Sequence, residues 1–260
     1  MSALKFFCWS LVLFASFLSS TSHALTPSPS LKKALDAIYD SYDKKHQCWR
    51  HNAEGEYFYC FKLDRIDQLE TAQSKRLYVL LAGAKYTAGG ENGAHAEPGM
   101  VGAFVFKQVG EQLTTLVGDP SYEVGSWGKA PTQWQWVKLG PDHYWGWKNS
   151  WSDGHQGAVG SRYTILAPYG KGIKEIADII ESYDDAGACM PETGCKPSSY
   201  SSTLKIDSTQ FNNKVFPLIL TASGKKEGKP IKKKTWIVPF NLNKWQYEES
   251  KDWPMSGLDY

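Results

Sequence analysis

The stretch VGAFVFKQVGEQLTTLV, residues 101–117, decides the fold class. Two short runs rich in β-branched and aromatic residues, 101–106 and 112–117, flank the turn-forming segment 108–111. This arrangement predicts an antiparallel β-hairpin. Near the C-terminus, residues 214–221 and 232–240 flank a Gly- and Lys-rich segment, which predicts a second hairpin.

Short strand-like runs continue along most of the chain. They are aromatic or β-branched and are separated by turn-forming residues; they comprise residues 57–61, 76–86, 134–137, 143–147 and 162–166. Residues 173–180 suit either a short helix or a half-buried strand. Because the strands are short and do not alternate regularly with helices, they favour an antiparallel sheet over a parallel one.

One helix is expected near the start of the folded part. Between residues 28 and 45, Leu31, Leu35, Ile38 and Tyr42 recur at helical spacing, and Ser30 can cap the first turn. The predicted fold class is therefore α+β, predominantly antiparallel β in a sandwich-like or curved sheet, with an N-terminal amphipathic helix.

Residues 1–24 have the features of a cleavable secretory signal peptide. Lys5 gives a small positive start, residues 6–18 are almost continuously apolar, and Ser22-His23-Ala24 has the small-x-small form that a signal peptidase accepts. The apolar run is shorter than the roughly 20 residues that a membrane span needs. We therefore expect a periplasmic or secreted protein with no membrane span in its mature part.

The mature part, residues 25–260, is expected to form a single β-rich domain. Residues 184–200 are rich in acidic, Gly, Pro and Ser residues and are a candidate boundary between two sub-domains. A long surface loop on one domain is the alternative, and we favour it.

The cysteines fit an oxidised, exported domain. Cleavage after residue 24 removes Cys8 and leaves four cysteines, which allow three disulfide connectivities. Each neighbouring couple flanks a short turn-rich segment, so we predict the disulfides Cys48–Cys60 and Cys189–Cys195. Their spacing matches no common zinc pattern.

The charge balance and the missing motifs narrow the function. The chain has 29 Lys and Arg against 27 Asp and Glu, whereas nucleic-acid-binding proteins normally carry a strong basic excess, so nucleic acid is not an expected partner. The sequence has no nucleophile elbow, zinc-protease motif, phosphate loop or dinucleotide fingerprint. We therefore expect no cofactor and no metal, and a binding protein is favoured over an enzyme.

An aromatic-rich stretch between residues 127 and 151 is the first candidate site. Trp145 and Trp147 are two positions apart, so on a strand they lie on the same face, and Trp151 and His143 lie close to them in sequence. If that face is exposed, its indoles can stack on a sugar ring or anchor a protein partner. If it faces inward, the same residues form the core.

The Gly-rich loop 88–98 is the second candidate site. It holds Glu91, His95 and Glu97, which could act as general acid–base groups if the fold brings them against a second carboxylate such as Asp142 or Asp153. A surface loop whose glycines only form turns is the alternative.

A run of lysines around the C-terminal hairpin is the third feature. It comprises Lys225, Lys226, Lys229, Lys232, Lys233 and Lys234. These side chains could meet an anionic polymer or a membrane surface, or they could keep an edge hairpin from pairing with other chains.

Two function hypotheses follow from these features. The leading one is an exported binding protein that holds a protein or glycan of the cell envelope on the surface formed by Trp145, Trp147, Trp151 and His143. The alternative is a cell-wall or glycan hydrolase with Glu91, His95 or Glu97 as acid–base residues.

Overall fold

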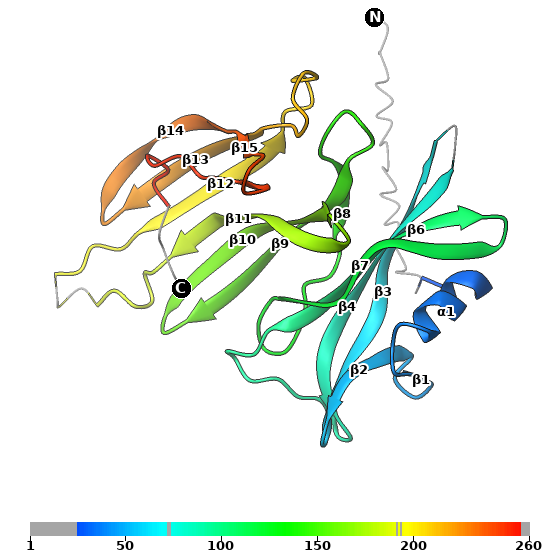
Figure 1. Cartoon of the computed structure of the whole chain (residues 1–260). Coiled ribbons are helices and arrows are strands. Elements are labelled where there is room, and N and C mark those ends of the chain that lie inside the picture. Colours follow the sequence, from blue (N-terminus) through cyan, green and yellow to red (C-terminus); the bar gives the residue numbers. More distant parts are fainter. Residues whose placement is uncertain (1–24, 72–73, 191, 193, 256–260) are drawn as a thin grey trace, which may run out of the picture.

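The computed structural model describes residues 25–255 except 72–73, 191 and 193. The expected signal peptide, residues 1–24, lies outside the described residues and stays a prediction. The described chain is mostly antiparallel β-structure with one short helix. Its strands form two seven-stranded sheets and a small two-stranded one (Figure 1).

The first sheet has the strand order β1-β2-β3-β4-β6-β7, and β5 pairs with β4. Its strands are β1 (Ser41–Asp43), β2 (Cys48–Glu54), β3 (Tyr57–Glu70), β4 (Lys75–Thr87), β5 (Gly90–Glu91), β6 (Gly99–Val109) and β7 (Gln112–Val124). The hairpin expected over 101–117 is present as β6 and β7, and both strands are longer than expected.

The second sheet has the strand order β14-β13-β12-β11-β10-β9-β8. Its strands are β8 (Gln135–Lys138), β9 (Trp145–His155), β10 (Ala158–Tyr169), β11 (Gly172–Asp184), β12 (Ser199–Ile206), β13 (Leu218–Lys226) and β14 (Lys229–Val238). The ambiguous segment 173–180 is part of β11. The two-stranded sheet consists of β15 (Phe240–Asn241) and β16 (Gln246–Tyr247).

The described helix, α1 (Pro29–Asp36), is shorter than the segment 28–45 that the periodicity indicates. Ser28 caps it by accepting a hydrogen bond from the Leu31 N–H, and Leu31 and Leu35 are buried. Beyond the helix, the Asp40 N–H donates to the carbonyl oxygen of Arg50. The chain therefore turns into β1, where pairing with β2 replaces further helical hydrogen bonds.

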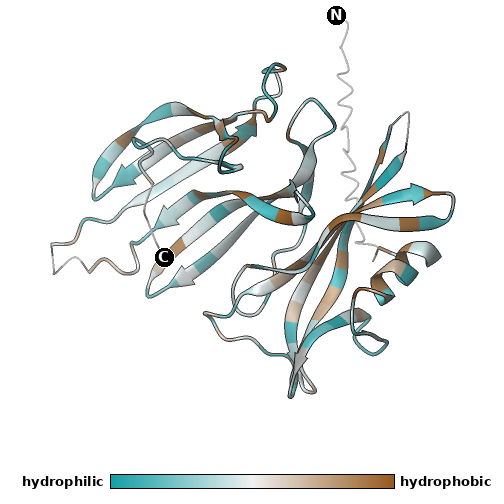
Figure 2. Cartoon of the chain, viewed as in Figure 1, coloured by the Kyte–Doolittle hydropathy of each residue, from teal (hydrophilic) through white to brown (hydrophobic). Residues whose placement is uncertain are grey.

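Hydrophobic side chains form a core on each sheet and a third cluster between the sheets. Hydrophobic and hydrophilic residues alternate along many of the strands that contribute to them (Figure 2). The core of the first sheet includes Leu31 and Leu35 of α1. The core of the second sheet is covered by the C-terminal segment, from which Tyr247, Trp253 and Met255 are buried. The third cluster joins residues of β4 and β6 to residues of β9 and β10, so the two sheets pack against each other.

The chain crosses from the first sheet to the second between β7 and β8, at residues 125–134. The segment 184–200, considered above as a sub-domain boundary, instead joins β11 to β12, which are neighbours in the second sheet. Residues 125–134 are therefore the segment that connects the two sheets.

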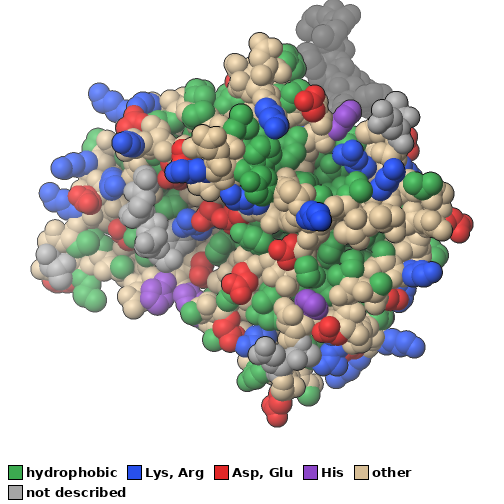
Figure 3. Space-filling model, in the orientation of Figure 1, with side chains coloured by type: hydrophobic (Ala, Val, Ile, Leu, Met, Phe, Trp, Pro, Cys, Tyr) green, Lys and Arg blue, Asp and Glu red, His purple; other side chains and the backbone are tan. Residues whose placement is uncertain are grey.

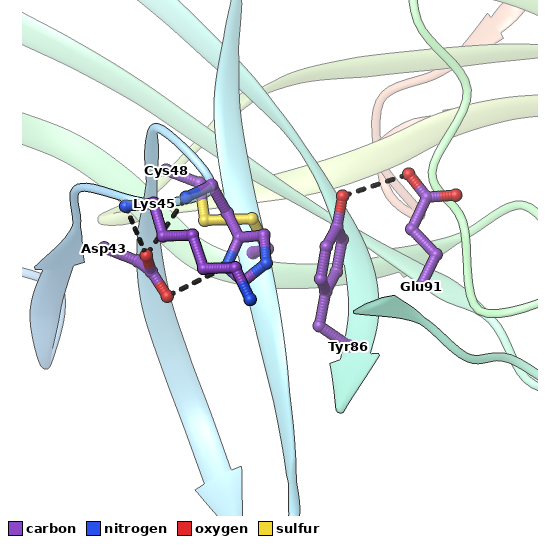
Figure 4. The surroundings of a disulfide bond; sticks show 7 residues. Asp43, Lys45, Cys48, Tyr86 and Glu91 are labelled. Atoms are coloured by element: carbon purple, nitrogen blue, oxygen red, sulfur yellow. Dashed lines mark hydrogen bonds and ion pairs between the residues drawn. A yellow bond between two sulfur atoms is a disulfide. The ribbon is translucent and has the colours of Figure 1, made fainter. Parts of the chain in front are cut away.

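Both predicted disulfides, Cys48–Cys60 and Cys189–Cys195, are confirmed. The first connects β2 to β3, and Cys48 and Cys60 are both buried beside Tyr86 of β4 (Figure 4). Among the described residues, no helix has the length and apolar character needed to cross a membrane.

Candidate ligand-binding cleft

An open cleft lies where the two sheets meet and has a volume of about 620 Å³. Three segments line it: β5 with the loop that follows, the turn after β7, and the distal part of β9. Its lining residues are Glu91, Asn92, Gly93, Gly125, Ser126, Trp127, Lys129, Ala130, Pro131, Trp151 and Ser152. A smaller hollow of about 200 Å³ shares Glu91, Lys129 and Ala130 with this cleft.

The turn at residues 125–128 holds Trp127 at the cleft, with about half of this residue exposed to solvent. Trp127 is 52% exposed. Its backbone N–H donates to the carbonyl oxygen of His95 (3.2 Å), and the next N–H, of Gly128, donates to that of Glu97 (2.7 Å). The carbonyl oxygen of Gly128 accepts from the Lys85 N–H (2.7 Å). The exposed indole therefore stands on a backbone fixed to the loop 88–98 and to β4.

Trp127 also adopts a left-handed backbone conformation, with φ of 55°. Bulky side chains rarely occupy this region, and holding one there costs about 1–3 kcal/mol. Glycine adopts positive φ without strain, as it does at positions 125 and 128, where φ is 89° and 66°. Glycine would therefore also suit position 127. A strained, exposed tryptophan at a position that glycine could fill points to a use for its side chain.

The loop 88–98 approaches this turn so closely that residue 93 must lack a side chain. A Cβ atom on Gly93 would overlap the backbone carbonyl group of Trp127. Gly93 therefore does more than form a turn, because it permits the contact that shapes the cleft.

His95 connects the loop 88–98 to β9 of the second sheet. Its Nε2 lies 2.9 Å from the carbonyl oxygen of Gly154 and 3.2 Å from Oδ1 of Asp153. The imidazole also meets the Trp127 ring nearly at right angles, with 4.8 Å between ring centroids, and stacks on His155 at 5.2 Å. The loop thus meets the carboxylate of Asp153, one of the two named for the hydrolase alternative.

Glu91 and Glu97, the two carboxylates of this loop, are each paired with a lysine. Glu91 forms an ion pair with Lys129 and accepts a hydrogen bond from the Tyr86 hydroxyl at 3.1 Å (Figure 4). Glu97 pairs with Lys85 at 2.5 Å. The hydrogen bonds from these lysines lower the pKa of both carboxyl groups. A glycosidase general acid needs a raised pKa, so these contacts argue against that role.

The expected indole ladder exists, but it faces the first sheet. Trp147 is fully buried, in the cluster between the sheets, with its ring 5.7 Å from that of Tyr78 on β4. Trp136 lies opposite Trp147 on β8 and also packs against this cluster. The interpretation of Trp147 as an exposed ligand contact is therefore wrong, because the first sheet covers that face of β9.

The other residues of the expected aromatic surface do not gather at one place. Trp145 is half-buried and stacks on Trp136, with 3.8 Å between ring centroids. Trp151 lines the cleft, six residues further along β9, which is a separation of roughly 20 Å. His143 lies in the exposed turn before β9, on the far side of Trp145. Of this group, Trp151 is the member that contributes to the cleft.

Trp151 also differs from the other tryptophans of the ladder because its indole N–H has a hydrogen-bond partner: Nε1 donates to the Thr164 hydroxyl at 3.0 Å.

Within the residues that the structure describes, no group of three or more His, Cys, Asp or Glu side chains is arranged to hold a metal ion. The cleft thus offers aromatic rings, hydroxyls, an amide and one ion pair as its contacting groups.

The sequence analysis included Trp127 in the aromatic-rich stretch 127–151 and Asn92 in the loop 88–98, but it named neither as a binding residue, and it did not consider Ser126 or Lys129 as site residues. A signal for the first was present: Trp127 stands within Gly125-Ser126-Trp127-Gly128, where flanking glycines indicate a tight turn that exposes the residue between them. No local pattern brings Lys129 to Glu91, because the two lie on segments that meet only in the folded chain.

Comparisons of the chain with protein-family models, with curated proteins and with solved structures find no match.

Proposed function

We propose that the protein is an exported binding protein, periplasmic or secreted, and that its cleft holds a glycan of the cell envelope. The strained and exposed Trp127 at the cleft carries this proposal. Two disulfides support an oxidising compartment, because such bonds persist mainly outside the reducing cytosol. The site differs from the aromatic surface first expected, since it uses Trp127 and Trp151.

The chemistry of the cleft favours a glycan over a flat protein surface. It is concave, and concave sites with a few polar groups suit small ligands. Trp127 and Trp151 offer apolar ring faces for a sugar, while Asn92, Ser126 and Ser152 offer hydrogen-bonding groups. Glu91 and Lys129, the charged residues of the lining, form an ion pair with each other. The lining is therefore close to neutral, which suits a neutral sugar.

Replacing Trp127 with alanine should weaken glycan binding about thirtyfold, a loss of about 2 kcal/mol that is typical of a central aromatic contact. Fold stability should change little, because the indole is half in solvent. Titration calorimetry with N-acetylglucosamine oligomers and with oligosaccharides from digested peptidoglycan measures the affinity. Phe211→Ala, at a residue that is 73% exposed, is the matched control and should bind like the unaltered protein.

Equal affinity in the two variants would place the ligand elsewhere, and no binding of either glycan mixture would remove the glycan proposal. The same mixtures also test the hydrolase alternative. We expect mass spectrometry to recover the oligosaccharides uncleaved, because Glu91 and Glu97 are held as ionised partners of lysines.

A further inference from the structure

Strands β12, β13 and β14 concentrate positive charge within an otherwise balanced chain. Together they contain seven lysines and neither aspartate nor glutamate, whereas the whole chain has 29 basic and 27 acidic residues. The seven are Lys205, Lys225, Lys226, Lys229, Lys232, Lys233 and Lys234. Lys and Arg side chains project along this margin of the molecule (Figure 3).

The three strands turn a regular array of side chains away from the core. Thr203, Thr221 and Thr235 lie opposite one another in neighbouring strands and form one row across the sheet. Residues next to them in sequence, such as Leu220 and Trp236, face the opposite side and are buried. Since strand residues alternate between faces, the threonine row marks the outer face of the sheet.

A second and a third row flank the threonines. Lys205 lies in register with Ile219 and Ile237 on one side. On the other side, Ser201 lies in register with Ser223. The pairing of β13 with β14 is interrupted by a bulge at Ser223, and Lys233 of β14 lies at this bulge. The outer face thus combines hydroxyl groups, two aliphatic side chains and two lysines.

This face is hollowed rather than flat. A shallow depression of about 540 Å³ is lined by Ser201, Ser202, Thr203, Lys205, Ile219, Thr221, Ser223, Lys233 and Thr235. Lys205 and Lys233 lie two rows and two strands apart, so their Cα atoms are separated by a distance on the order of 15 Å. The depression is therefore long enough for several sugar units, with a positive charge toward each end.

The charges of this face are available for a partner. Lys205 and Lys233 are exposed and form no ion pair with any residue that the structure describes. By contrast, Lys234 pairs with Asp252 and Lys226 donates to the carbonyl oxygen of Pro254, so these two hold the C-terminal segment. Lys205 and Lys233 make no such contact with the described part of the C-terminal segment.

Protection of a sheet edge does not account for the whole array. Lysines on an edge strand prevent pairing with other chains, which explains the lysines of β14. At Lys205, β12 is paired with β13 but no longer with β11, because the ladder between β11 and β12 covers only Ser199–Ser201. Edge protection can therefore also explain Lys205, but the hydroxyl rows add nothing to such protection.

We propose that the outer face of β12–β14 is a second binding site, separate from the cleft, and that it takes an acidic polysaccharide. The lysines meet carboxylate or sulfate groups along the polymer, and serine and threonine hydroxyls donate to them, except the one that donates within the Thr221–Thr235 hydrogen bond. Ile219 and Ile237 contact the apolar faces of the sugar rings. A membrane surface fits less well, because lipid-bound faces insert apolar and aromatic side chains around their charges. This proposal does not depend on the glycan in the cleft.

The test uses the double variant Lys205→Ser/Lys233→Ser with heparin and polygalacturonate as sulfated and carboxylated probes. We expect its affinity for both probes to fall about tenfold at low salt, because two steering charges are lost. Lys107→Ser/Lys171→Ser is the matched control: it makes the same change in net charge at exposed lysines elsewhere, one on β6 and one in the turn between β10 and β11. The control should lose less than about twofold, and neutral dextran should not bind.

Further measurements separate this site from the alternatives. Thr221→Val retains every charge but removes a hydroxyl from the central row, so it should also weaken polygalacturonate binding. Trp127→Ala should leave that binding unchanged, which distinguishes failure of this proposal from failure of the cleft proposal. Equal losses in both lysine double variants, or no binding of either polymer, would overturn the proposal. Preferential binding to vesicles of phosphatidylglycerol or to DNA would overturn it too.

Discussion

Replacing Trp147 with alanine should lower the free energy of unfolding by about 3–5 kcal/mol, the usual loss for a fully buried tryptophan. Its side chain lies in the cluster between the sheets, against Tyr78 and close to Leu166 of β10. Among the residues that the structure describes, the indole N–H of Trp147 has no hydrogen-bond partner, so the loss comes from packing alone. Urea unfolding monitored by circular dichroism measures the change.

Trp127→Ala is the control for this experiment, because it removes the same side chain from an exposed position and should cost under about 1 kcal/mol. The pair of variants separates the two uses of tryptophan in this chain. If Trp147→Ala unfolded like the unaltered protein and instead lost glycan affinity, the indole ladder would be a ligand surface and the packing between the sheets would be wrong.

The sequence predicts which tryptophans share a face more reliably than it predicts what covers that face. Alternation along a strand places Trp145, Trp147 and Trp151 on one side, and the structure has them so. Whether that side is core or surface depends on β4, whose Tyr78 is about 70 positions earlier in the chain. No local pattern carries such information.

Features that depend on residues close together in the sequence were predicted well. The disulfides close short loops, and the hairpin of β6 and β7 has its turn between the two runs that pair. The helix prediction extended too far, because Ile38 and Tyr42 keep helical spacing while the backbone from Asp40 onward joins β2. Tertiary pairing overrode the local preference there.

The cleft could be predicted from the sequence only in part. A Gly-rich loop with His95 was a candidate from sequence, and Asp153 was one of two carboxylates named for it. Their contact at 3.2 Å required the whole fold to form. Trp127 was visible as an aromatic residue between glycines, yet its left-handed backbone and its exposure follow from hydrogen bonds to residues 95 and 97.

Glu175→Gln should stabilise the protein by about 3 kcal/mol above pH 7 and leave its stability nearly unchanged at pH 4.5. Burial at the contact between β11 and β7, together with the nearby Asp178, raises the pKa of Glu175 from 4.5 to about 7. The cation beside it, Arg162, donates two hydrogen bonds of 2.7 Å to Asp178. Glu175 itself forms no hydrogen bond or ion pair with a described residue.

The direction of this change in stability with pH follows from whether the folded or the unfolded chain holds the proton of Glu175. Below pH 4.5, Glu175 is protonated in both the folded and the unfolded chain, so it does not affect stability. Between pH 4.5 and 7, the unfolded chain releases the proton while the folded chain keeps it, and stability falls by about 1.4 kcal/mol per pH unit. Above pH 7, the folded chain carries a buried carboxylate and the loss is complete. Glutamine mimics the protonated form and avoids this loss.

Urea unfolding of both proteins at pH 4.5, 6 and 8 measures the effect as a difference between them. Contributions from the other ionisable groups are common to both proteins, so they cancel in that difference. Glu97→Gln serves as the opposite control: Lys85 lowers the pKa of Glu97, so this variant should lose stability at neutral pH and not gain it. A stability difference between Glu175→Gln and the unaltered protein that stays constant from pH 4.5 to 8 would show that folding does not raise the pKa of Glu175, and that water or a cation reaches the junction between β7 and β11.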